Sequence, residues 1–167
     1  HPDWALGAAE QPLGRQQRVL DLSRQDVTSY LYSRICALLD EYDIDYIKWD
    51  HNRVLPTPVA GQTDALYQLL DDLGEAHPQV EIESCASGGG RADFGILQHT
   101  DRVWTSDSND ALDRLNIQHG FSMFFPAEVM GSHVGPFDCH ITGRKINMAA
   151  RSGVALFGHM GLEVNLL

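Results

Sequence analysis

Short β-type runs alternate with amphipathic stretches of helical period along nearly the whole chain, and this alternation restricts the fold more than composition does. Six runs predict β-strands, at residues 17–22, 44–50, 80–85, 102–106, 120–126 and 153–159. Apolar side chains at helical spacing predict helices over residues 24–42, 62–76, 109–119 and about 141–151, with a short helical segment at 92–99. Prolines and a glycine predict a loop over residues 54–61. The alternation favours parallel strands joined by crossover helices.

Three of the predicted strands end in residues of catalytic type. One ends at Asp50, one at Cys85 before a glycine-rich turn, and one at Asp107. In a (β/α)8 barrel the catalytic side chains come from the ends of several strands at one face, so these strand ends would converge on one pocket. They favour a (β/α)8 barrel, and an open doubly wound sheet is the structural alternative.

The strand that ends at Asp50 predicts a ligand site. Lys48, Asp50 and Asn52 stand at a spacing of two, so in an extended chain their side chains project from one face. A cation, a carboxylate and an amide would then meet at the mouth of a sheet or barrel, where ligands bind. A surface ion pair is the alternative explanation, and a second carboxylate cluster at residues 104–110 favours the ligand site.

Asp50 and Asp107 fit the pair of carboxylates that a retaining glycosidase uses. One carboxylate attacks the anomeric carbon, and the other protonates the leaving oxygen and later activates water. The two roles need opposite protonation states. Lys48 would keep Asp50 ionised, and Trp104 with its apolar strand would exclude water from Asp107.

Other features have simpler interpretations. Asp110 and Asp113 fall in or near the first turn of a predicted helix, where acidic residues favour the helix dipole, and Ser108 or Asn109 would cap that helix. The turn at 87–91 lacks the Gly-Lys-Ser/Thr of a phosphate loop, and its glycines would let the backbone approach a ligand. No histidine or cysteine spacing matches a metal site, and no cofactor is expected.

Composition narrows the possible partners. The 167 residues are 43% hydrophobic, enough for a core, and the formal net charge of −11 disfavours nucleic acid and anionic membranes as partners. No apolar run approaches the roughly twenty residues of a membrane helix. Cys36, Cys85 and Cys139 are too few and too far apart for a disulfide framework, which favours a cytoplasmic location. The first residue is not Met, so we expect the chain to be part of a longer protein.

Three long motifs follow one another along the chain. They are Tyr-Ile-Lys-Trp-Asp-x-Asn-Arg at 46–53, Glu-Ser-Cys-Ala-Ser-Gly-Gly-Gly-Arg at 83–91, and Trp-Thr-Ser-Asp-x-x-Asp-Ala-x-x-Arg-Leu-x-Ile-Gln at 104–118. Together they resemble the α-galactosidases of glycoside hydrolase family 36, and the resemblance covers nearly the whole chain. It implies a (β/α)8 barrel, of which the six predicted strands would be the third to the eighth.

By that resemblance Asp50 is the nucleophile that forms a galactosyl-enzyme, and Asp107 is the acid/base. The implied substrates are α-linked galactosides such as melibiose and raffinose, and the full-length family member is expected to be a homo-oligomer.

The resemblance also implies a set of residues that bind galactose: Lys48, Asn52, Cys85, Ser87 and Gly88. Arg53 and Arg91 match the motifs as well, and their roles stay open between substrate contact and loop support.

The chain departs from the family in three ways. The N-terminal β-sandwich, the first two barrel strands and the C-terminal β domain have no counterpart, so residues 1–167 would be a partial catalytic domain. A catalytically silent fragment with a structural or interaction role is therefore an alternative. A related α-galactosyltransferase or α-N-acetylgalactosaminidase is a further one.

Overall fold

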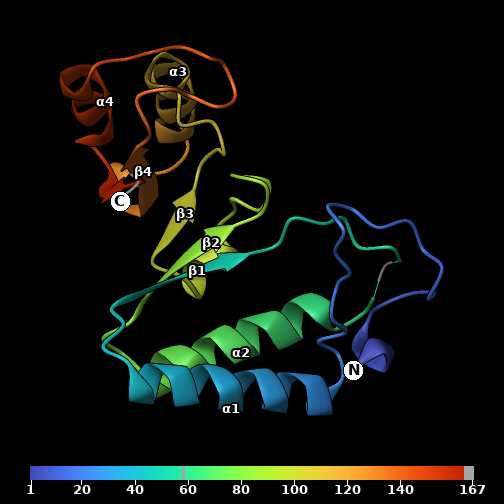
Figure 1. Cartoon of the computed structure of the whole chain (residues 1–167). Helices are drawn as coiled ribbons and strands as arrows, with labels where there is room; N and C mark the ends of the chain where they lie inside the picture. The colour runs from blue at the N-terminus through green and yellow to red at the C-terminus, as the bar shows by residue number, and fades with distance from the viewer. Residues whose placement is uncertain (58, 164–167) are drawn as a thin grey trace. The chain divides into compact units, whose positions relative to one another are not determined.

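A computed structural model describes residues 1–57 and 59–163 of the chain. The chain divides into two compact units, His1–Ile82 and Glu83–Leu167, and the boundary falls inside one β-strand. Position 58 of the predicted loop lies outside the described residues. Each unit contains both strands and helices (Figure 1).

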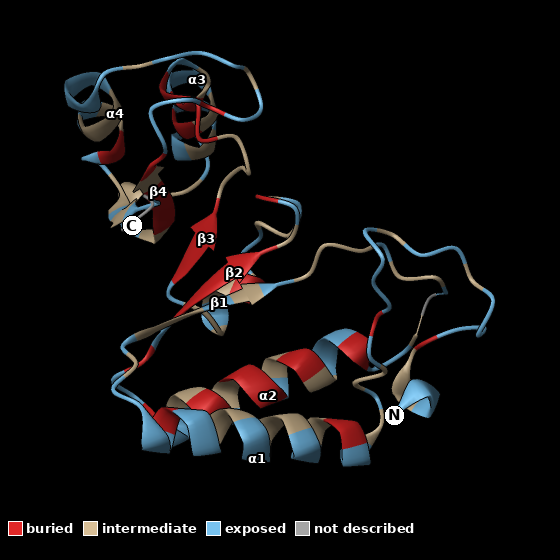
Figure 2. Cartoon of the chain, in the orientation of Figure 1, coloured by how far each residue is buried: buried red, intermediate tan, exposed pale blue. Residues whose placement is uncertain are grey.

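Two helices, α1 at Gln25–Glu41 and α2 at Gln62–Ala76, lie side by side in the first unit (Figure 1). Both were predicted from the spacing of their apolar residues. α2 buries one face, which is formed by four leucines at helical spacing, Leu66, Leu69, Leu70 and Leu73. α1 buries Val27 and Leu39, and much of its surface is exposed (Figure 2).

The strands that follow these helices are β1 at Tyr46–Asp50 and β2 at Glu81–Cys85. The amide of Glu81 donates to the carbonyl of Asp45 at 2.8 Å. In β2 every residue after Glu81 is buried. In β1, by contrast, Lys48 and Asp50 are exposed and the other three residues are half-buried. The apolar run at residues 44–47 predicts a buried strand, and this prediction is wrong. Among the described strands, in the order β1-β2-β3-β4-β5, β1 lies at an edge of the sheet.

The second unit continues the β-α alternation. Its elements are β3 at Arg102–Trp104, α3 at Ala111–Ser122, β4 at Met130–Val134, α4 at Met148–Ala155 and β5 at His159–Leu162. The strand pairs from β2 to β5 are parallel, with Ser84 opposite Val103 and Val103 opposite Met130. α3 and α4 are the crossover connections, and they lie side by side (Figure 1).

The described residues also contain three single-turn 3-10 helices, at Pro2–Trp4, Ile96–Gln98 and Ala127–Val129. None of the helices in the described ranges is long and apolar enough to cross a membrane.

The core of the second unit includes a buried ion pair. Glu83 is fully buried, and its Oε2 accepts a hydrogen bond from Nε of Arg102 at 3.2 Å. Nη1 of Arg102 also lies 3.1 Å from Nδ1 of His159. A β-carbon at Gly131 would lie 2.7 Å from Oε2 of Glu83, so this layer of the sheet requires glycine at that position.

Residues 17–22 do not form the predicted strand. They make only isolated bridges, from Leu20 to Ala5 and from Gln17 to Gly14. Arg15 and Gln16 between the last pair have φ values of +52° and +62°, so the chain reverses in a tight turn instead of extending.

The last two predicted strands are also wrong, because their apolar residues belong to helix ends. α3 continues to Ser122 and α4 continues to Ala155, and the exposed Phe124 and Phe157 follow them. The helix predicted near 141–151 begins only at Met148, and the segment predicted at 92–99 contains only a 3-10 turn.

Candidate active site

The end of β1 carries a carboxylate beside an amide. The side-chain amide of Asn52 donates a hydrogen bond to Oδ2 of Asp50. Lys48 and Asp50 are exposed at alternate positions of the strand, in agreement with the spacing of two. A pocket of about 240 Å³ opens here, and its walls include Asp50, Asn52, Val19 and Gln62.

Arg53 supports a loop of the first unit. Its Nη2 donates to Oε1 of Gln11 at 3.0 Å and to the carbonyl of Pro12 at 2.6 Å. A β-carbon at Gly14 would lie 3.0 Å from Nη1 of Arg53, so the loop closes tightly around the guanidinium. The sequence left two roles open for Arg53, substrate contact and loop support. These contacts are those of loop support.

The glycine-rich turn after β2 packs against the end of β3. Ser87 and Gly88 have φ values of +51° and +82°, and the amide of Gly89 donates to the carbonyl of Thr105 at 3.1 Å. A β-carbon at Gly89 would lie 2.9 Å from that carbonyl oxygen. The glycines are therefore required for a close approach of two chain segments, and an approach to a ligand stays a prediction.

Asp107 lies three residues beyond β3 and is half-buried. Nε1 of Trp104, the last residue of that strand, donates to Oδ1 of Asp107 at 3.2 Å. The amide of Ser108 donates to Oγ of Ser106 at 3.1 Å, which tightens the chain around the carboxyl group. The candidate acid/base is thus held by its own strand.

Arg114 is a residue that sequence analysis missed. It is 1% exposed, and its Cζ lies 4.7 Å from the ring centroid of Trp104. Its hydrogen-bond acceptors are Oγ1 of Thr105 (2.7 Å) and the carbonyls of Ser106 (3.2 Å) and Gly131 (2.7 Å). Burial lowers the pKa of Arg114 to about 10, so the guanidinium stays charged at neutral pH.

A signal for this residue is present in the sequence. Asp110, Arg114 and Gln118 stand at spacings of four, and all three are buried on one side of α3. Nε of Arg114 donates to Oε1 of Gln118 at 3.2 Å. A polar stripe at helical spacing therefore marks the side of α3 that faces the sheet.

Asp110 is the N-cap of α3, not Ser108 or Asn109 as predicted. It accepts hydrogen bonds from the amides of Leu112 and Asp113, from Thr142, and from Nη1 of Arg144 at 2.9 Å. Burial acts to raise the pKa of Asp110, but these hydrogen bonds together lower it below its ordinary value.

A second polar cluster lies beside Trp104. Nδ1 of His133 lies 2.8 Å from Oε1 of Glu163, and the side-chain amide of Asn109 donates to Oε2 of Glu163 at 2.7 Å. The rings of His133 and Trp104 have centroids 4.5 Å apart. The stacking of His133 on Trp104 and the contact of His133 with Glu163 thus connect β4 with the end of β3 and with the residue that follows β5.

The predicted site residues thus fall into two groups. Lys48, Asp50 and Asn52 stand together in the first unit. In the second unit Cys85 ends β2, and Ser87 and Gly88 begin the turn that packs near Asp107. A substrate shared by Asp50 and Asp107 stays a prediction. Within residues 1–57 and 59–163, no three His, Cys, Asp or Glu side chains form a group that could hold a metal ion.

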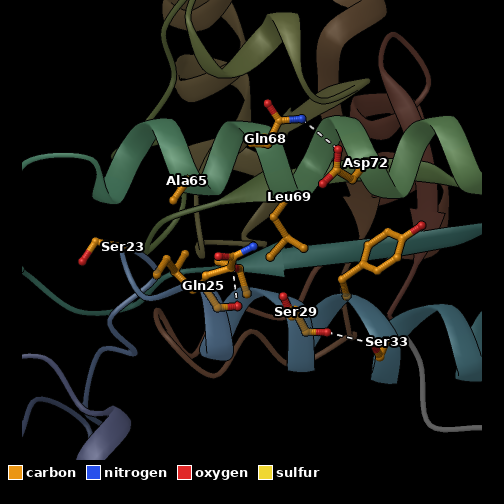
Figure 3. A pocket seen from close by; sticks show the side chains of 11 residues that line it. Ser23, Gln25, Ser29, Ser33, Ala65, Gln68, Leu69 and Asp72 are labelled. Atoms are coloured by element: carbon orange, nitrogen blue, oxygen red, sulfur yellow. Dashed lines mark hydrogen bonds between the residues drawn. The ribbon is translucent and has the colours of Figure 1, made fainter.

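A larger groove, of about 560 Å³, lies between α1 and α2 (Figure 3). Its walls are mostly polar; Gln68 donates to Oδ1 of Asp72 at 2.8 Å, and Ser33 donates to the carbonyl of Ser29 at 2.8 Å. No predicted site residue lines this groove. Of these two pockets, the one at Asp50 coincides with a candidate catalytic group.

The chain is similar to known proteins over almost its entire length. A family model described as Melibiase matches residues 1–167. The α-galactosidase of Escherichia coli is 51% identical over 174 residues, which cover 99% of this chain and 25% of that protein.

Solved structures are similar as well. The galactosidase domain of the α-galactosidase–sucrose kinase AgaSK superposes with a TM-score of 0.90 at 38% identity, over 100% of this chain and 24% of that one. The family 36 α-galactosidase AgaA of Geobacillus stearothermophilus, in complex with raffinose, gives a TM-score of 0.86 at 37% identity, over 99% of this chain and 25% of that one. These structures confirm the predicted fold class, a part of a (β/α)8 barrel. The chain spans about a quarter of the length of the curated relatives it matches.

Proposed function

The chain belongs to the melibiase family, and from this we propose that it forms part of the catalytic domain of a retaining α-galactosidase. The observation that carries the proposal is the position of two carboxylates. Asp50 is the last residue of β1, and Asp107 follows β3 by three residues. Both stand where enzymes with (β/α)8 barrels place catalytic groups, at the carboxyl ends of strands.

In the proposed reaction Asp50 is the nucleophile and Asp107 is the acid/base. A carboxylate oxygen of Asp50 bonds to C1 of galactose while the bond from C1 to the leaving oxygen breaks, and Asp107 gives that oxygen a proton. In the second step water attacks C1, its proton passes to Asp107, and the bond to Asp50 breaks. Galactose leaves with the α configuration of the substrate.

The proposed galactose subsite comprises the five predicted binding residues, Lys48, Asn52, Cys85, Ser87 and Gly88. The hydrogen bond from Asn52 to Oδ2 of Asp50 supports it, because it orients the nucleophile. The AgaA complexes with raffinose and stachyose support α-galactosyl oligosaccharides as the substrate class, with melibiose as a smaller member.

We use "full-length protein" for the polypeptide that the whole gene encodes. The quarter-length coverage of the relatives supports a proposal that residues 1–167 are a partial catalytic domain of a longer protein. That this longer protein is a homo-oligomer is proposed from the family resemblance alone. Cys36, Cys85 and Cys139 are not joined in disulfide bonds, which supports a reducing, cytoplasmic location. The coverage of only about a quarter of each relative is also the observation that favours the second candidate function, a catalytically silent structural piece.

The stereochemistry of hydrolysis tests this proposal. We expect proton NMR to detect α-galactose first when the full-length protein cleaves an aryl α-galactoside, before mutarotation. Early β-galactose would indicate inversion and would exclude Asp50 as a nucleophile. Release of galactose from neither the aryl substrate nor melibiose would favour the silent role.

A further inference from the structure

We propose that Trp104 is a positioning residue for Asp107 and determines which carboxyl oxygen carries the catalytic proton. The inference rests on the proposed function, in which Asp107 is the acid/base. It begins with the hydrogen bond of 3.2 Å from Nε1 of Trp104 to Oδ1 of Asp107.

An indole nitrogen donates a hydrogen bond and does not accept one. Oδ1 of Asp107 therefore presents a lone pair to Trp104. In the acid form of the carboxyl group the carbonyl oxygen is the stronger acceptor, so this hydrogen bond favours the proton on Oδ2. Oδ2 gives this proton to the leaving oxygen as the bond from C1 to that oxygen breaks, and it takes a proton from water in the second step.

Two neighbours hold the indole in this orientation. The guanidinium of Arg114 lies 4.7 Å from the ring centroid, and the ring of His133 lies 4.5 Å away. Both neighbours are themselves held. Arg114 donates to Thr105 and Ser106, which follow β3, and to Gly131 of β4, and Nδ1 of His133 lies 2.8 Å from Oε1 of Glu163. Trp104 is 2% exposed, so water does not compete for its N–H group.

Arg114 also binds the chain between the indole and the carboxyl group. It donates to Oγ1 of Thr105 at 2.7 Å and to the carbonyl of Ser106 at 3.2 Å. One buried cation thus contacts the indole and the two residues that link it to Asp107. Pre-orientation of an acid in this way lowers the barrier only for steps in which its proton is transferred.

This leads to a test by leaving group. Departure of fluoride from an α-galactosyl fluoride needs little protonation, whereas departure of the sugar from melibiose needs a full proton transfer. Trp104→Phe keeps an aromatic ring and removes the N–H group. We expect it to lower kcat/KM of the full-length protein for melibiose by about 10-fold or more, and for the fluoride by less than about 3-fold.

Two further variants make the result interpretable. Trp4→Phe is the matched control, because Trp4 stacks on His1 with ring centroids 3.8 Å apart and lies outside the candidate site. In this variant the ratio of kcat/KM for melibiose to kcat/KM for the fluoride should equal that of the wild type. Asp107→Ala is the reference, and it should show the same selective loss for melibiose, to a larger extent.

The outcomes separate the two proposals. Equal losses for both substrates in Asp107→Ala would overturn the acid/base role and this inference with it. A selective loss in Asp107→Ala without one in Trp104→Phe would overturn the inference alone. If Trp104→Phe does not fold, benzothienylalanine at position 104 replaces the N–H group by sulfur at nearly constant volume. It should reproduce the selective loss, and a ratio equal to that of the wild type would overturn the inference.

Discussion

Gly88 packs so closely on Ser106 that a β-carbon at position 88 would lie 2.7 Å from Cα of Ser106 and 3.1 Å from the amide nitrogen of Asp107. The turn after β2 and the end of β3 therefore fit together through backbone atoms. Because neither backbone can rotate away as a side chain would, the position of Asp107 depends on this contact.

Gly88→Ala should therefore damage both stability and catalysis. The φ of +82° disfavours any side chain, and the new methyl group would displace residues 105–107. We expect the free energy of unfolding to fall by roughly 2 kcal/mol or more, measured by urea denaturation, with a loss of kcat.

The control for this change is Gly74→Ala. Gly74 lies inside α2, and a β-carbon there would meet no heavy atom within 4 Å. This substitution should stabilise the protein by about 0.5–1 kcal/mol. Equal effects of the two alanines would contradict the account of the contact between Gly88 and Ser106.

Arg114→Lys should destabilise the second unit although it keeps the charge. A lysine ammonium cannot reach the carbonyls of Ser106 and Gly131 in the geometry of the planar guanidinium, which would leave buried acceptors without donors. We expect a loss of roughly 2–4 kcal/mol in a denaturant titration. Arg34→Lys, at an exposed position of α1, is the matched control and should change stability by less than about 0.5 kcal/mol.

Asp110→Asn should reduce the acid sensitivity of the fold. The lowered pKa of Asp110 means that its carboxylate stabilises the folded state fully above the ordinary value of 3.8. This contribution is lost as the pH falls from about 3.8 through the lower pKa of the folded state. Asparagine is also a good N-cap, so the substitution removes chiefly the charge that Arg144 binds.

Above pH 5 the variant should be less stable than the wild type by roughly 1–3 kcal/mol, and the difference should shrink toward zero in strong acid. Thermal unfolding over a pH series measures this. Asp43→Asn, at an exposed position before β1, is the matched control and should change stability above pH 5 by less than about 0.5 kcal/mol. A difference between Asp110→Asn and the wild type that is constant with pH would exclude titration of Asp110 as its source.

The helices of the first unit could be predicted from sequence because their leucines recur at helical spacing. The strand β4 could not, because Gly131, Ser132 and His133 have low β propensity and become strand only through burial between neighbours. Conversely, Phe124 and Phe157 resemble strand residues but follow helices and are exposed. A local sequence pattern does not predict secondary structure where contacts with other parts of the fold determine it.

The site shows the same division. Asp50 and Asp107 could be singled out because each ends an apolar run. The contact of Arg144 with Asp110 joins residues 34 positions apart, and no periodicity predicts such a pair. Arg114 could have been found from the stripe it forms with Asp110 and Gln118. Its acceptors on Thr105 and Ser106, which follow β3, and on Gly131 of β4 depend on how α3 packs, which is a tertiary property.

The most direct test of the central claim is to trap the covalent intermediate. The full-length protein is incubated with a slow α-galactosyl fluoride and digested, and its peptides are analysed by mass spectrometry. We predict a galactosyl-type adduct on the peptide that contains Asp50, and none in Asp50→Asn. An adduct on another residue, or no adduct in an enzyme that still cleaves melibiose, would contradict the account.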